Sequence, residues 1–208
     1  MKHGWRLVLF FSGLVCFALA MKERTLGDDG KGNFAVHGLG AQTCQILLEE
    51  LKADKTAPAL AESWLMGYVT AVNRLDTETY DALPVLDSNV LLAIVVNICQ
   101  QHPDNLVETV AKEIINTLSS ARSKHESPIL EITNDDRSVH VRVDTLTDMQ
   151  RKLAQMGYLK NSADGIYNES TKEAISKFQR EEKLSITGIP DAPTIIHLLV
   201  EIPDHADK

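Results

Sequence analysis

The side chains that could catalyse a reaction are present in this sequence, but they form no recognised catalytic pattern. The seven histidines are scattered, and no set of them has the spacing of a metal site. No H-E-x-x-H, G-x-S-x-G or phosphate-loop motif occurs. Neither Cys44 nor Cys99 has a neighbouring base that would activate it as a nucleophile. We therefore expect a protein that is not an enzyme and that uses neither a cofactor nor a metal.

The charge of the chain excludes a second class of function. The 208 residues carry 21 Lys and Arg against 29 Asp and Glu, which gives a formal net charge of −8. Proteins that bind nucleic acid need clustered cations for the phosphates, so nucleic acid is not an expected partner. With 44% hydrophobic residues, the composition is that of a globular protein with room for one or two domains.

The first twenty residues have the pattern of an export signal. Lys2 and Arg6 precede an apolar run over residues 7–17, and the small-x-small sequence Ala18-Leu19-Ala20 follows. The apolar run is shorter than the roughly 18 residues of a membrane-spanning helix. We predict a cleaved signal peptide over residues 1–20 and no membrane span after cleavage. An uncleaved membrane anchor is the alternative.

Cleavage would leave a periplasmic or secreted chain with two cysteines, Cys44 and Cys99, and a net charge of −10. An even pair of cysteines in an exported protein predicts one disulfide bond. Two buried free thiols are the alternative.

Helical periodicity begins after residue 41. Cys44, Leu47, Leu48 and Leu51 fall on one face of a helix, and three further helical stretches follow. The pattern predicts an all-α domain over residues 37–122, with a third helix that is buried nearly all round. In the second helix, Gly67 is expected to let another helix approach closely.

Two segments without helical periodicity flank this domain. Residues 21–36 are charged and rich in glycine, which predicts a flexible arm. Residues 123–144 contain two alternating stretches around the turn-like tetrapeptide Asn134-Asp135-Asp136-Arg137. A short β-hairpin and an extended linker both fit this segment.

Residues 145–202 carry a signature of three short helices and the loops between them, followed by a tail over 203–208. The marks, in chain order, are Leu146, Gln150, Leu153, Gly157-Tyr158, Asp164-Gly165-Ile166-Tyr167, Thr171, Ala174-Ile175, Phe178-Gln179, Leu184, Thr187-Gly188, Asp191 and Thr194. This order of marks resembles the three-helix peptidoglycan-binding domain of many wall hydrolases and envelope proteins. The resemblance implies a three-helix fold and peptidoglycan as a partner.

The same resemblance implies where a sugar or a stem peptide would be held. Groups near the loops offer flat aromatic faces and hydrogen bonds. The candidates are Tyr158, Asp164, Tyr167, Asn168, Thr171 and Gln179. Many family members have glycine at the position of Asn168, and asparagine tolerates the left-handed conformation that such a turn needs.

The helical domain resembles two kinds of exported helical protein, the HdeA-like acid-stress chaperones and the immunity proteins that neutralise secreted wall amidases. The residues behind this resemblance are Thr43-Cys44, the Ser63–Tyr68 segment with Asn73, and Cys99–Pro103. Trp64 and Tyr68 lie one helical turn apart. Packing around the cystine and a partner-binding aromatic patch are both compatible with this pair.

Together these patterns predict a mainly α-helical protein with a disulfide-tied N-terminal domain and a peptidoglycan-binding-like C-terminal domain. The expected function is that of an exported, wall-associated, non-enzymatic protein whose helical domain contacts another envelope protein. The alternative is a chaperone or immunity protein whose C-terminal domain is only structural.

Overall fold

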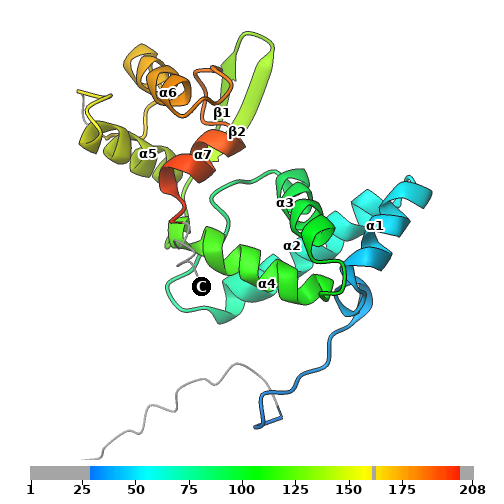
Figure 1. Cartoon of the computed structure of the whole chain (residues 1–208). Helices are drawn as coiled ribbons and strands as arrows, with labels where there is room; N and C mark the ends of the chain where they lie inside the picture. Colours follow the sequence, from blue (N-terminus) through cyan, green and yellow to red (C-terminus); the bar gives the residue numbers. More distant parts are fainter. Residues whose placement is uncertain (1–28, 161–162, 202–208) are drawn as a thin grey trace, which may run out of the picture. The chain divides into compact units, whose positions relative to one another are not determined.

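The computed structural model describes residues 29–160 and 163–201 of the chain (Figure 1). The chain divides into two units, Met1–Phe34 and Ala35–Lys208. The predicted signal peptide, the predicted tail and half of the predicted arm lie outside the described residues. The described half of the arm, residues 29–36, forms no helix and no strand.

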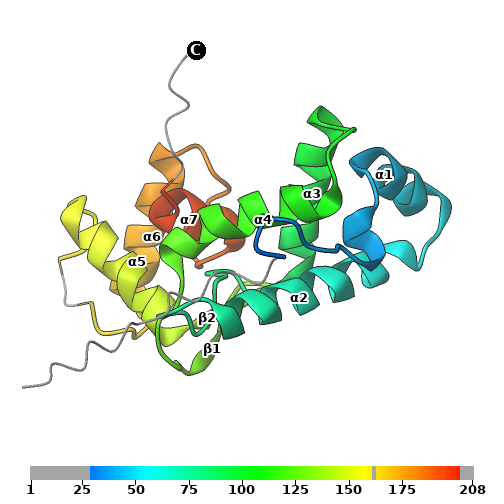
Figure 2. The same cartoon turned by 90° about the horizontal axis from the view of Figure 1, so that it is seen from below.

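The fold is mainly α, as the sequence predicts. The described part of the chain contains seven α-helices and one two-stranded antiparallel sheet (Figures 1 and 2). In chain order the elements are η1 (Gly38–Ala41), α1 (Cys44–Ala53), α2 (Ala57–Leu75), α3 (Ser88–Gln101), α4 (Val107–Leu118), η2 (Ser119–Ala121), β1 (Ile129–Asn134), β2 (Arg137–Arg142), α5 (Val143–Gln155), α6 (Glu169–Glu181) and α7 (Ala192–Leu199). None of the described helices combines the length and the hydropathy that crossing a bilayer requires.

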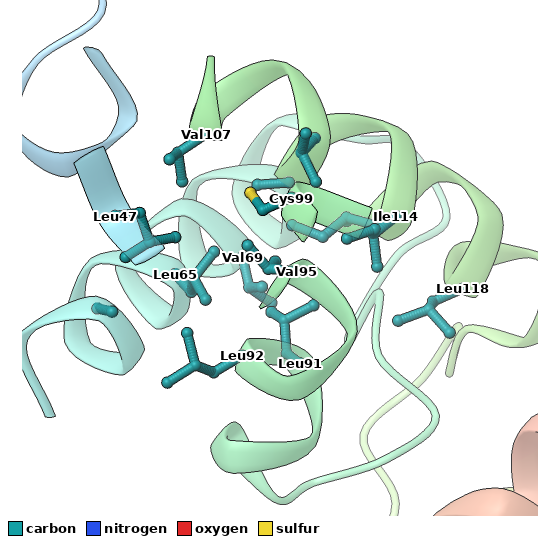
Figure 3. Close-up of a cluster of buried hydrophobic side chains, with 14 of the residues drawn as sticks. Leu47, Leu65, Val69, Leu91, Leu92, Val95, Cys99, Val107, Ile114 and Leu118 are labelled. Carbon is teal, nitrogen blue, oxygen red and sulfur yellow. The ribbon is translucent and has the colours of Figure 1, made fainter. Parts of the chain in front are cut away.

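Helices α1 to α4 share one apolar core (Figure 3). Each helix contributes side chains that are almost wholly buried, among them Leu47, Leu65, Val95 and Ile115. Such side chains recur every three or four residues, so each helix turns one face to the core. The predicted disulfide is confirmed: Cys44 at the start of α1 is bonded to Cys99 near the end of α3, and both residues are fully buried.

Two predictions about this domain were wrong. Helix α3 is not buried all round, because Asn89, Ala93 and Asn97 form an exposed stripe along one side. These residues recur every four positions inside a very apolar run, so they share one face of the helix. Gly67 does not admit another helix, since no atom lies within 4 Å of the place that a Cβ would take.

The segment between the two predicted domains is a β-hairpin rather than an extended linker. Strand β1 pairs with β2 antiparallel, from Ile129 opposite Arg142 to Asn134 opposite Arg137. Asp135 takes a φ of +54° in the tight turn, a conformation that aspartate tolerates better than most residues. The hairpin also contributes to packing, because Ile132 and Val141 are buried in the core of the C-terminal helices.

Helices α5, α6 and α7 surround a second core, whose largest fully buried side chains include Leu146, Met149 and Ile195. One ion pair connects this part to the helical domain. The Arg142 guanidinium lies 2.9 Å from the Asp81 carboxylate, and both side chains are 13% exposed. Asp81 also exchanges backbone hydrogen bonds with Ser123.

Candidate functional site

A buried glutamine holds the loop between α5 and α6. Gln150 projects from α5 and is 1% exposed. Its Oε1 accepts the backbone N–H of Gly165 at 2.8 Å. Its Nε2 lies within bonding distance of the Ile166 carbonyl, the Thr171 hydroxyl and the Asp164 carboxylate. One side chain therefore joins the loop to Thr171 in α6 and gives the buried Gly165 N–H its acceptor.

A second buried glutamine does the same for the loop between α6 and α7. Gln179 projects from α6 and is fully buried. Its Oε1 accepts the backbone N–H groups of Thr187 and Gly188, each at 2.9 Å. Its Nε2 reaches the hydroxyls of Thr187 and Thr194, at 2.8 and 2.9 Å.

The two loops are copies of one arrangement. The segment Gly165-Ile166-x-Asn168-x-x-Thr171 matches Gly188-Ile189-x-Asp191-x-x-Thr194 in spacing. The glycines have φ values of +72° and +70°, where a side chain would strain the backbone. Asn168 and Asp191 cap α6 and α7 by accepting the N–H of the threonine three residues on. Asn168 has a φ of −138°, so the left-handed conformation expected at this position was wrong: the residue is an extended helix cap. Sequence reasoning missed this duplication, although the equal spacing was its visible signal.

Four of the six predicted ligand residues belong to the hydrogen-bond network of these two loops. Thr171 and Gln179 are 1% and 0% exposed, and their polar atoms face the interior. Asp164 and Asn168 are exposed, but each already accepts hydrogen bonds from its own loop or helix. Any contact of these residues with a ligand stays a prediction, and for the two buried residues it would require the loops to open.

The two predicted tyrosines lie at the edges of the same loops. Tyr167 is half-buried, its hydroxyl donates to the Gly188 carbonyl at 2.8 Å, and burial raises its pKa to about 12. The Tyr158 hydroxyl donates to the Glu181 carboxylate, and this bond raises the pKa of the tyrosine. The bond between Tyr167 and Gly188 joins one loop to the other.

Comparison with known proteins matches this part of the chain to a family. The model of the family described as "Putative peptidoglycan binding domain" matches residues 142–198. The match covers α5, α6 and most of α7 together with both loops. The C-terminal domain is of the peptidoglycan-binding type. No curated protein and no solved structure matched the chain.

The start of the peptidoglycan-binding-type domain packs closely on its first loop. A Cβ at Gly165 would lie 2.7 Å from the Val143 side chain and 2.8 Å from the Thr147 hydroxyl. The first turns of α5 therefore border the loop, and Ile166 beside it is 60% exposed.

The predicted aromatic pair lies in the helical domain, outside the matched residues. Trp64 and Tyr68 stack with ring centroids 5.5 Å apart, but they differ in what else they contact. The Tyr68 hydroxyl donates to the buried carboxylate of Glu108, and burial raises the pKa of this tyrosine well above its usual range. Trp64 donates from Nε1 to the His37 carbonyl, so it holds η1 against α2.

Trp64 also lines an open groove of about 420 Å³, which Tyr68 does not. The groove runs between α1, α2 and η1, and most of its lining is apolar. The lining residues are Leu39, Gln42, Leu47, Glu50, Asp54, Ala57, Leu60, Ala61 and Trp64. Leu60 at this groove is 67% exposed.

Across residues 29–160 and 163–201, no three His, Cys, Asp or Glu side chains gather as a set that could hold a metal ion.

Proposed function

We propose that this protein is an exported, non-enzymatic component of the cell envelope, in the periplasm or outside the cell. In this proposal its C-terminal domain holds peptidoglycan and its helical domain contacts another envelope protein. The observation that carries the proposal is the family match over residues 142–198, which covers α5, α6, most of α7 and the two loops between them. The match supports peptidoglycan binding.

Other features support the remaining parts of the proposal. The sequence contains no catalytic motif, so binding without cleavage is the expected activity. The Cys44–Cys99 disulfide is typical of proteins that fold in an oxidising compartment, which agrees with the signal pattern of residues 1–20.

Binding to purified sacculi tests the function. We expect the protein to sediment with sacculi and to release no soluble muropeptides during the incubation. A wall hydrolase in a parallel sample provides the positive control for release, and serum albumin provides the control for non-specific sedimentation. If the protein stays in the supernatant, peptidoglycan binding is refuted and the chaperone or immunity alternative takes its place. Released muropeptides would refute the non-enzymatic assignment instead.

The groove beside Trp64 is the proposed contact site of the helical domain. Its apolar floor carries two carboxylates, Glu50 and Asp54, and no cation. Residues 37–122 hold 11 acidic and 5 basic side chains, so the surroundings are negative as well. This combination fits a partner segment with apolar side chains next to Lys or Arg, in the manner of an amphipathic helix in a groove.

A designed peptide can probe this groove, because Trp64 is the only tryptophan after residue 20. A Leu/Lys amphipathic helix should shift the Trp64 fluorescence, and the same peptide with Glu in place of Lys should not. Leu60→Ser should weaken binding by about tenfold, since a buried leucine anchor is lost. Leu75→Ser is the matched control, because Leu75 lies on the same helix, is 57% exposed and is absent from the groove. Equal binding of the Lys and Glu peptides would contradict the assignment.

A further inference from the structure

A polar groove of about 540 Å³ lies where α5 meets the segment that joins the two cores. One wall is a single face of α5, formed by residues 143, 144, 147, 148 and 151, which recur at helical spacing. The other wall is the joining segment, residues 120–122 and 124–128. The α5 face belongs to the residues that match the peptidoglycan-binding family, yet it does not contribute to the core of that domain.

The first turn of α5 fixes the joining segment at one end of the groove. The Val143 N–H donates to the Pro128 carbonyl at 2.9 Å, and the Asp144 N–H donates to the Ser127 hydroxyl at 3.0 Å. These bonds place Glu126, the residue before Ser127, at the same end as Asp144. The backbone donors of the helix start are thus occupied, and the side chains are what the groove offers to a ligand.

The groove presents both signs of charge on both walls: Arg122, Lys124 and Glu126 lie on the joining segment, and Asp144, Asp148 and Arg151 lie on α5. Lys124 pairs with Glu78, and Arg122 donates to backbone carbonyls. Among the described residues, Glu126 and Asp144 have no cationic partner, and Asp144 accepts only the N–H of the following residue. Arg151 lies seven residues further along α5, which is about 10 Å at the rise of an α-helix. Arg151 pairs with Asp148, but both side chains are at least half exposed, so the pair can exchange for a ligand.

The loop face of the same domain differs from this groove. There, the polar atoms of Gln150, Thr171 and Gln179 already bond to one another and to the loops. A charged ligand would have to break those bonds to bind, whereas the carboxylates of Glu126 and Asp144 would gain a partner. Binding in the groove therefore breaks fewer of the fold's own hydrogen bonds than binding on the loop face.

The charges of the groove match one of the two parts of peptidoglycan, the stem peptide. The glycan strand is built from neutral N-acetylated sugars, whereas the stem peptides carry free carboxylates and free ammonium groups. We propose that this groove binds the charged peptide portion of peptidoglycan. Glu126 and Asp144 receive an ammonium group, and Arg151 binds a carboxylate through charge-assisted hydrogen bonds. The inference rests on the proposed function and adds to it the moiety that is recognised.

Two competitors for binding to sacculi separate the two proposals: the soluble glycan strands that an amidase releases when it removes the stem peptides, and a soluble stem tripeptide that ends in diaminopimelate. The protein should sediment with intact sacculi. The tripeptide should compete at least about tenfold more strongly than the glycan strands, the usual size of a lost charged contact, and the same tripeptide with its amines acetylated should not compete. If the protein sediments and the glycan strands compete as well as the tripeptide, the groove assignment is overturned while peptidoglycan binding stands. If the protein does not sediment, both fail.

Variants then locate the contact. Glu126→Gln with Asp144→Asn should weaken tripeptide binding by about tenfold, and so should Arg151→Gln. Asp144→Asn keeps the side-chain oxygen that accepts the Thr145 N–H, so the start of α5 is preserved. Glu173→Gln and Lys152→Gln are matched controls, because both residues are exposed, belong to the same domain and do not line the groove. Unchanged affinity in the groove variants, with circular dichroism unchanged, would overturn the assignment.

Discussion

A variant with Cys44→Ala and Cys99→Ala should have a free energy of unfolding about 4 kcal/mol below that of the native chain. The disulfide closes a loop with a sequence separation of 55 residues. In the chain-entropy model, a cross-link of that span stabilises the fold by about 4 kcal/mol, because it restricts the unfolded chain. A loss of this size is a large part of the total stability of a small domain.

The fluorescence of Trp64 measures the loss of stability in the helical domain, which contains the disulfide. Trp64 packs in the helical domain, so a denaturant titration followed at this residue reports on the part that the cystine joins. A reducing agent should lower the stability of the native chain by the same amount and leave the double variant unchanged. If the double variant and the native chain unfold at the same denaturant concentration, the helical core alone determines stability.

The substitution Gln179→Ala should lower the stability of the C-terminal domain by about 3–5 kcal/mol, because it leaves buried polar groups without hydrogen-bond partners. The backbone N–H groups of Thr187 and Gly188 would lose their acceptor, and two threonine hydroxyls would lose their donor. The removed side chain also leaves a cavity, since Gln179 is fully buried.

Hydrogen exchange provides the measurement for Gln179→Ala. The amides of Thr187 and Gly188 should lose protection first, and the Trp64 transition should change far less. Gln155→Ala is the control, because Gln155 is exposed on α5 and should change stability by less than about 0.5 kcal/mol. If the Gly188 amide keeps its protection in Gln179→Ala, water replaces the Gln179 side-chain amide without loss of stability, and the prediction is wrong.

The sequence predicts the secondary structure and the cores of this protein well, because both depend on the local spacing of apolar residues. Cys44 and Leu47 recur with the spacing of a buried helix face, and Asp191 stands where a helix cap belongs. The disulfide could be predicted because cleavage of the predicted signal peptide would leave only two cysteines to pair. Local periodicity could not decide between a hairpin and a linker at residues 123–144. That choice depends on Ile132 and Val141 finding the C-terminal core.

The candidate site was less predictable, because its polar contacts join residues that are far apart in the sequence. Gln150 reaches Thr171 across 21 residues, and nothing in the residue types shows that this glutamine faces inward. Gln179 was a candidate for ligand binding for the same reason. The groove along α5 depends on the joining segment folding back onto Asp144, which only the three-dimensional structure reveals.

The duplicated loops give the C-terminal domain the organisation of a repeat protein. Each copy consists of a helix with an inward glutamine, a glycine turn and the capped start of the next helix, so α6 ends the first copy and begins the second. Helix α7 contains no glutamine, and the series stops there. In the terms used for solenoids, α7 is the terminal cap of a two-unit array. Lengthening this array would require a glutamine in α7 and one more glycine turn, so the domain is a starting point for designed extensions of its surface.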